Sequence, residues 1–205
     1  MSPADWLLVL GLAGTAVFAI NGALTAVQAA RLDIVGVLTL GTITALGGGI
    51  VRDVLLGVLP PQGLADWRFL AVALAASAVV FLAHRRLAKF LVAVTIFDAA
   101  GLSLFCVTGT LAALDHGSGP LLAVILGTTT AVGGGTFRDL LTLRVPQILT
   151  SDLYAIPALV GATATWGAWA LGWRSPLTYL VAALLCFGIR MVGVKYKLHA
   201  PRVRP

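Results

Sequence analysis

The chain has 205 residues, of which 59% are hydrophobic and only 11% are charged, and its formal net charge is +6 at pH 7. A mean hydropathy of +0.99 excludes an ordinary soluble domain, because one chain of this length cannot bury so much apolar surface in water. The basic excess does not indicate nucleic acid binding, since the Lys and Arg residues lie in short loops and near the C-terminus without interleaved aromatic residues.

Apolar stretches separated by charges, prolines and loop residues predict transmembrane helices. In chain order they cover residues 6–30, 34–59, 67–83, 90–114, 121–143, 153–172 and 177–194. A helix needs about 20 apolar residues to cross a bilayer, so we expect seven spans, the third and seventh being short and ended by basic residues that reach the interface. The first stretch lacks a basic segment before it and is too long for the core of a signal peptide, so we interpret it as a retained helix.

The distribution of basic residues predicts the orientation. In a seven-span chain, 11 of the 14 Lys and Arg residues lie on the side of the C-terminus, including Arg85 and Arg86. Basic residues accumulate on the cytoplasmic side of a membrane. We therefore expect a multi-pass protein of the cell membrane, with its N-terminus outside and its C-terminus in the cytoplasm.

The pattern Gly-Gly-Gly-x-x-Arg-Asp occurs twice in the chain. Its members are Gly47, Gly48, Gly49, Arg52 and Asp53 in the first copy, and Gly133, Gly134, Gly135, Arg138 and Asp139 in the second. Three consecutive glycines leave the backbone unrestrained, so we expect both helices to lose regular winding there and to expose carbonyl groups to a hydrated passage for a monovalent cation. The alternative is that the glycines only allow two helices to pack closely.

The duplication extends beyond the glycine triplets. At an offset of 87, the residues Gly14, Phe18 and Gly22 match Gly101, Phe105 and Gly109; at an offset of 86, Gly41, Thr44 and Pro60 match Gly127, Thr130 and Pro146. The repeated unit is three spans long, and an odd number of spans inverts the second copy. We expect an all-α membrane protein with an inverted 3+3 repeat and an additional helix: one domain over residues 1–205, with repeats at 6–83 and 90–172 and the extra helix at 177–194.

The Arg-Asp pairs follow one turn after the glycines. Adjacent residues on a helix do not face one another, so we expect Arg52 and Arg138 to find partners other than Asp53 and Asp139. Our hypothesis is that these arginines hold a kinked conformation and help to gate the passage. The alternative is that they only anchor helix ends at the two interfaces.

Asp98 is the one acidic residue well inside a predicted span, and Gly11 occupies its position in the first repeat. An intramembrane carboxylate is costly unless it is paired, hydrated or protonated, and it is therefore a candidate functional residue. It could attract a cation, pair with an arginine, or remain neutral and hydrogen-bond to another helix.

A polar stripe runs along the first predicted helix. Asn21, Thr25 and Gln28 lie at i, i+4 and i+7 and so share one face. Thr108 matches Asn21 in the second repeat, and threonines near both triplets add further hydroxyl groups. Neutral oxygens suit a weakly bound monovalent cation better than a divalent one, although many of these hydroxyls could simply bond to the carbonyl four residues earlier.

Other residue types do not indicate an enzyme. His84, His116 and His199 are far apart, with no metal-ligand or catalytic spacing, and Cys106 and Cys186 lie in apolar runs as expected of buried thiols. The triplets lack the Lys-Ser/Thr of a phosphate-binding loop. We expect no catalytic residue, no cofactor and no metal beyond a permeating K+ ion.

The duplicated Gly-Gly-Gly-x-x-Arg-Asp, Phe18-Ala-Ile-Asn-Gly22 and Asp98-Ala-Ala-Gly-Leu102 resemble the prokaryotic trimeric intracellular cation (TRIC) channels over nearly the whole chain. The resemblance implies a homotrimer of seven-helix subunits, each with its own potassium-permeable path and with its second and fifth helices kinked at the glycines. Some bacterial relatives are instead described as glycine transport proteins.

We therefore expect a channel permeable to K+, with Na+ as a second candidate ion, in contact with the lipid bilayer and not with nucleic acid. Its passage would be lined by the glycine-bearing helices and by the polar residues named above. The alternative is a secondary transporter of glycine or another small zwitterion, because helix ends can offer charge to both of its groups. A third interpretation is a scaffold that conducts nothing.

Overall fold

The structure is a computed structural model that describes residues 3–30, 32–87, 91–150 and 153–198. Within these ranges the long helices are α1 (Pro3–Thr25), α2 (Ile34–Leu55), α4 (Trp67–Leu87), α5 (Leu91–Asp115), α6 (Pro120–Leu141), α8 (Ala155–Ala170) and α9 (Pro176–Tyr196). They match the seven predicted stretches. A short π-helical segment (Ala26–Ala30) continues α1, and the four-residue helices α3 (Gln62–Ala65) and α7 (Gln147–Thr150) were not predicted.

Local signals in the sequence explain where several helices begin. Asp33 precedes α2, and its carboxylate accepts a hydrogen bond from the Gly36 amide at 2.8 Å. Ser175 precedes α9 and accepts from the Thr178 amide. Such N-cap oxygens satisfy amides that have no partner in the first turn. Proline occupies the first position of α9, where its missing amide costs nothing.

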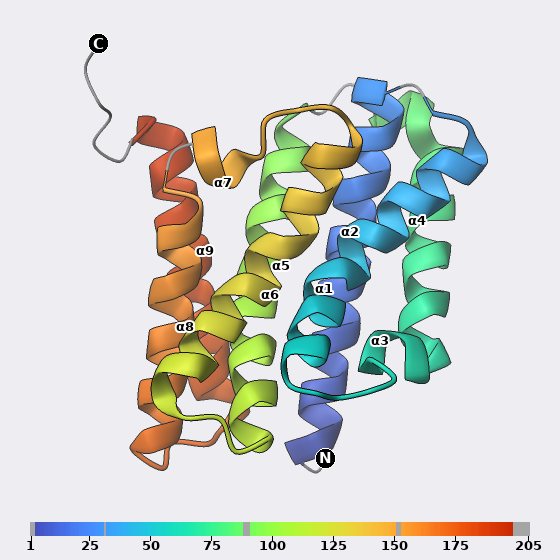
Figure 1. The fold of residues 1–205 in the computed structure, drawn as a ribbon. Coiled ribbons are helices and arrows are strands. Elements are labelled where there is room, and N and C mark those ends of the chain that lie inside the picture. Colours follow the sequence, from blue (N-terminus) through green and yellow to red (C-terminus); the bar gives the residue numbers. More distant parts are fainter. Residues whose placement is uncertain (1–2, 31, 88–90, 151–152, 199–205) are drawn as a thin grey trace.

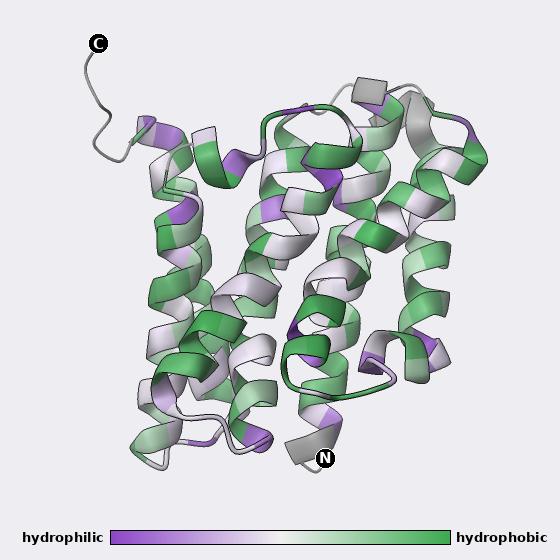
Figure 2. Ribbon diagram, viewed as in Figure 1, coloured by the Kyte–Doolittle hydropathy of each residue, from purple (hydrophilic) through white to green (hydrophobic). Residues whose placement is uncertain are grey.

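The helices form a multi-pass membrane protein. Within the described residues, α1, α2, α5, α6 and α9 are long and apolar enough to cross a bilayer. The apolar part of α4, Trp67–Ala83, is shorter than those spans, and α8 has only 16 residues. Apolar residues extend along the helices in Figure 2, whereas hydrophilic residues are concentrated toward the two ends.

The chain folds as two three-helix bundles of opposite direction. The helices α1, α2 and α4 pack on one another, as do α5, α6 and α8, and α9 packs on α5 and α8. In Figure 1, α1 runs upward and its repeat counterpart α5 runs downward, while α3 and α7 lie at opposite ends. The predicted inverted 3+3 repeat with an additional helix is therefore confirmed. We call the end where α1 begins the N-face and the end where α9 finishes the C-face.

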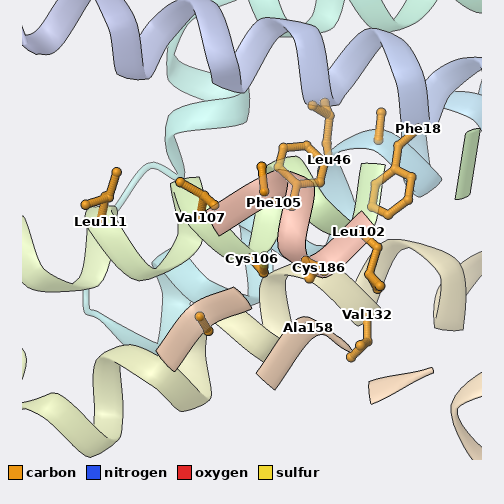
Figure 3. Close-up of a cluster of buried hydrophobic side chains, with 14 of the residues drawn as sticks. Phe18, Leu46, Leu102, Phe105, Cys106, Val107, Leu111, Val132, Ala158 and Cys186 are labelled. Atoms are coloured by element: carbon orange, nitrogen blue, oxygen red, sulfur yellow. The ribbon is translucent and has the colours of Figure 1, made fainter. Parts of the chain in front are cut away.

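The two bundles meet across α1, α2, α5 and α6. Phe18 and Phe105 are repeat counterparts, and their ring centroids lie 5.2 Å apart (Figure 3). Each ring packs over a glycine of the other bundle, Phe18 over Gly101 and Phe105 over Gly14. The core also contains Cys106 and Cys186, which are buried free thiols, as expected.

Several residues used to predict the orientation lie outside the description. Residues 31, 89, 202 and 204 are not described, nor are the side chains of Arg85 and Arg86. Arg138 and Arg190 are described, and both are buried inside the molecule rather than in loops.

Candidate functional site

The glycine triplets do not break their helices. The α-helix of α2 is continuous through Gly47–Gly49, and that of α6 is continuous through Gly133–Gly135. The expected loss of regular winding is therefore wrong. In lipid, a released backbone amide or carbonyl costs several kcal/mol, roughly, unless it finds a partner, and the intact helices keep these groups bonded.

The glycines instead allow α2 and α6 to cross in backbone contact. A Cβ atom on Gly48 would collide with the carbonyl oxygen of Thr130, and one on Gly134 would collide with that of Thr44. These two contacts are repeat counterparts. A Cβ on Gly133 would meet the Cα of Gly48 at 2.9 Å. The alternative that the triplets serve close packing is thus the one that the structure supports.

Arg138 lies at the centre of a buried polar cluster near the C-face. Its Nη1 is 2.8 Å from Asp98 Oδ1, and its Nη2 is 2.7 Å from Asp139 Oδ1. Nη1 also donates to Asn21 Oδ1, while Asn21 Nδ2 donates to the Val94 carbonyl at 2.7 Å. The Arg138 side chain is only 1% exposed, so it does not anchor a helix end at the interface. Two carboxylates compensate the cost of burying its charge.

Asp98 connects this cluster to α8 and α9. Its Oδ1 accepts a hydrogen bond from the Tyr154 hydroxyl at 3.2 Å, and its Oδ2 lies 4.0 Å from Arg190 Nη2. Arg190 also donates to Gln147 Oε1 at 3.0 Å and stacks over the Tyr154 ring at 4.8 Å. Of the three roles considered for Asp98, pairing with arginine is the one observed. We call Asn21, Asp98, Arg138, Asp139, Tyr154 and Arg190 the C-face cluster.

Arg52 and Asp53 form a smaller arrangement toward the N-face. Arg52 Nη2 lies 2.7 Å from Asp53 Oδ1, and Asp53 Oδ2 accepts from the backbone amide of Gln62 at 2.8 Å. Asp139 does the same in the second repeat, where its Oδ2 accepts from the amide of Gln147 at 2.9 Å.

The expectation that neighbouring Arg and Asp residues do not pair is therefore wrong at both sites, whereas Arg138 also has other partners, as expected, in Asp98 and Asn21. Each pair lies in the last turn of its helix, where the long arginine side chain can bend toward the carboxylate of the next residue. The first amide of the following short helix, α3 or α7, fixes the carboxylate in place to receive it.

A cavity of about 430 Å³ lies beside Arg52 and Asp53. Residues of α1, α2, α4 and α5 form most of its wall, and α3 closes part of it. Asp115 and His116 line it and are exposed, so the cavity opens on the N-face. Its polar lining includes Thr15 and Thr108, and the rest of its wall is largely aliphatic and aromatic.

The other predicted polar residues make mostly local bonds. Thr25 donates to the Asn21 carbonyl at 3.0 Å and Thr108 donates to the Leu104 carbonyl at 3.1 Å, in both cases four residues back along the helix. Gln28 Nε2 is buried without a hydrogen-bond partner among the described residues. Of the stripe, the Asn21 side chain is the one with hydrogen bonds to other helices within the described part of the chain.

Sequence reasoning missed Tyr154, Gln147 and Arg190. A signal existed for Arg190, because a charge inside an apolar span needs a partner. For Tyr154 the signal was weaker. Tyr154 is the repeat counterpart of Phe69 at an offset of 85, which is also the offset between the short helices α3 and α7 that precede these two residues.

The described residues contain no group of three or more His, Cys, Asp or Glu side chains arranged to hold a metal. The side chains of His84 and His199 lie outside the description.

The model of the family described as "Glycine transporter" matches residues 8–85 and 95–170. A UPF0126 membrane protein of Streptomyces coelicolor is 50% identical over 95% of this chain and 89% of its own length. The chain belongs to this glycine transporter family. A second relative, a UPF0126 inner membrane protein of Escherichia coli K12, is 41% identical over 74% of this chain and 73% of its own. The family is one of membrane proteins rather than enzymes.

Solved structures of TRIC channels are similar to this member of the glycine transporter family. The TRIC orthologue from Rhodobacter sphaeroides is 34% identical, covers 94% of this chain and 98% of its own, and has a TM-score of 0.87. A structure from work on conductance through TRIC cation channels is 35% identical, covers 96% and 97%, and has a TM-score of 0.86. The resemblance to prokaryotic TRIC channels is therefore confirmed, and with it the homology to cation channels.

Proposed function

We propose that the chain is a potassium-permeable channel with one passage in each subunit of a homotrimer. The observation that carries the proposal is the cavity that opens on the N-face and extends inward along the last turns of α2, in a chain homologous over nearly its whole length to TRIC cation channels. In this proposal the passage continues between the bundles, past the crossing of α2 and α6, to the C-face cluster. Arg52, Asp53 and Thr108 border its open end, and Asn21, Asp98, Arg138 and Asp139 border its closed end.

The chemistry of the cavity favours a monovalent ion. Its lining contains two carboxylates, and Asp53 is already paired with Arg52, so few charged oxygens remain for a divalent cation. The hydroxyls of Thr15 and Thr108 are neutral groups beside the same space. Such a lining holds ions weakly, and rapid conduction needs weak binding. This argument supports K+ or Na+ without separating the two.

The assembly and location follow the homologues in this proposal. The Rhodobacter sphaeroides orthologue is described as trimeric, and the Escherichia coli relative is described as an inner membrane protein. We extend both properties to this chain, with the C-face in the cytoplasm as the basic residues predict.

The test is a recording from the purified protein in planar bilayers under a potassium gradient. Discrete current steps that reverse near the potassium equilibrium potential support the proposal. A bilayer that remains silent at every voltage, while the protein is shown to be inserted, contradicts it. Replacement of K+ by Na+ on one side then measures the selectivity.

A second candidate function is carriage of glycine or another small zwitterion. It is favoured by the description of the family and by the presence of Arg52 and Asp115 in the lining of one cavity. An arginine can bind a carboxylate, and a carboxylate can bind an ammonium group. Saturable uptake of labelled glycine into proteoliposomes, without current steps, would favour the carrier over the channel.

A further inference from the structure

Besides the oxygens that border the proposed passage, the cavity at the N-face has a mostly apolar wall. Leu7, Leu8 and Leu46 line it together with two aromatic side chains, Phe69 and Phe105. A hydrated cation gains little from aliphatic walls, whereas a cation that carries alkyl groups buries apolar surface against them. Aromatic rings add attraction for a cation close to their faces.

The charges around the cavity favour a cation over an anion. Arg52 is the basic side chain deepest in the lining, and its Nε and Nη2 are both within 2.8 Å of Asp53 Oδ1. Because Arg52 and Asp53 form a direct ion pair, their net charge is zero. Asp53 Oδ2 is in turn occupied by the Gln62 amide.

Asp115 at the rim supplies the remaining negative charge. It is the last residue of α5, where the carbonyl end of the helix adds partial negative charge of its own. Among the described residues, no basic group lies within 4.0 Å of its carboxylate. Arg174 acts on it only from a longer distance and stacks over Trp169 at 4.4 Å. His116 is beside it, with Nδ1 2.8 Å from the Ala112 carbonyl.

We propose that this cavity is a binding site for small organic cations with apolar substituents, the class of the tetraalkylammonium ions. The cationic centre lies near Asp115 at the rim, and the alkyl groups extend along the apolar wall that contains Phe69 and Phe105. A volume of about 430 Å³ accommodates such an ion with several alkyl arms.

Within the described residues, the site opens on the N-face. The equivalent position in the second repeat has Asp98 in place of Gly11 and Tyr154 in place of Phe69, and these side chains are joined to Arg138 and Arg190. The charged cluster fills the space that the first repeat leaves open. We therefore expect an organic cation applied to the C-face to bind and block much more weakly.

Binding of the cation does not depend on conduction, but its effect on current rests on the proposed channel function. In that function the cavity is the entrance to the passage, so an occupied cavity blocks K+ flow. Two measurements on the full-length protein separate these statements: calorimetric titration of the purified protein with tetraethylammonium, and bilayer recording with tetraethylammonium added to one face at a time.

We expect saturable binding and a current block that is much stronger from the N-face. Asp115→Asn should weaken binding by about five- to tenfold, because it removes the unpaired charge at the rim. Phe69→Leu should weaken it by about two- to threefold, because it removes aromatic surface while keeping the wall apolar. Asp66→Asn is the matched control: it removes a partly exposed carboxylate at the N-face that pairs with Arg68 and does not line the cavity, so binding should not change.

The absence of binding to the wild-type protein overturns the proposal, as does equal affinity in the Asp115→Asn variant. Equal block from both faces overturns the claim of preferred access from the N-face. A silent bilayer with normal calorimetric binding contradicts the channel function and leaves the cation site standing.

Discussion

The two ends of the central helices carry the same Arg-Asp pair in unlike surroundings. At the N-face, Arg52 and Asp53 border a cavity and lie beside Gly11 and Phe69. At the C-face, Arg138 and Asp139 are enclosed with Asp98 and Tyr154. Both repeats thus keep an Arg-Asp pair whose carboxylate is fixed by the amide of a short helix. The residues at two neighbouring positions, Gly11 or Asp98 and Phe69 or Tyr154, decide whether the space beside the pair is open or filled.

The difference in surroundings also changes the free-energy cost of burying each arginine. Arg138 has no access to water and depends on Asp98 and Asp139 for compensation. Arg52 borders a cavity that opens to the N-face, so water can solvate the part of its guanidinium that Asp53 does not contact. Both pairs are buried, but removal of a partner should cost more where the remaining charge is fully enclosed than where it borders an open cavity.

The largest expected effect comes from Asp98→Ala. This change leaves Arg138 with one carboxylate instead of two and removes the carboxylate that lies 4.0 Å from Arg190, so we expect a loss of about 3 kcal/mol or more in the free energy of unfolding. Unfolding in mixed detergent micelles measures it. Asp53→Ala at the open end is the comparison, and equal losses at the two positions would contradict the distinction between a fully enclosed arginine and one that borders a cavity.

Substitutions at the crossing of α2 and α6 should reduce stability equally, whichever of the two helices carries them. Gly48→Ala and Gly134→Ala each place a methyl group against a backbone carbonyl of the other helix, so we expect each to cost about 1–3 kcal/mol or more. Thermal unfolding followed by tryptophan fluorescence reports the change.

Gly49→Ala is the matched control for the crossing. A Cβ at this position would have only Arg52 Nη2 near it, at 3.9 Å. Because alanine favours a helix more than glycine does, this variant should be neutral or more stable by up to about 1 kcal/mol. If it is destabilised as much as Gly48→Ala, the triplet does not act through the crossing.

Tyr154→Phe is expected to have a smaller effect. It gives the C-face cluster the residue type that its counterpart, Phe69, has beside the N-face cavity. It removes the hydroxyl that donates to Asp98, and we expect a loss of about 1 kcal/mol in unfolding free energy. Tyr179→Phe, on α9 near the opposite face, is the control and should have little effect. A Tyr154→Phe variant as stable as wild type would mean that this hydrogen bond is not needed to keep the cluster closed.

The smallest effect is expected for Thr108→Val. The hydroxyl bonds within its own helix, so its loss should change stability by no more than about 0.5 kcal/mol. Its counterpart Asn21 bonds to two other helices, and Asn21→Leu should cost about 1–3 kcal/mol. A reversed order in chemical denaturation would show that the two positions are not as unlike as the contacts indicate.

The sequence was sufficient to predict the helices and their symmetry. Apolar length located the seven long helices, and matched glycines and phenylalanines located the inverted repeat, because these features are set by residue type and spacing alone. Phe18 and Phe105 illustrate this: they were matched by offset, and they do meet between the bundles. Asp98 was correctly selected as exceptional, since an isolated carboxylate in a span must have a partner.

What the sequence could not predict depends on contacts between distant segments. Glycine triplets are compatible with a broken helix or with a close crossing, and only the position of the second helix distinguishes them. The Arg-Asp pairs were misjudged because the spacing rule for regular helices does not include the amide of a following short helix. Tyr154 and Arg190 lie 56 and 92 residues after Asp98, respectively, and no local pattern relates them.

The contact of Arg190 with the second bundle has a consequence for how the protein is made. Synthesis proceeds from the N-terminus, and early segments can fold before later ones exist. The first bundle has all its helices once α4 has been inserted. The second must wait for α9, because Asp98 and Gln147 receive Arg190 only when the last helix leaves the ribosome. A nascent chain stalled before α9 would therefore have one finished half and one half with an unfilled polar contact, a state that quality-control proteases could recognise.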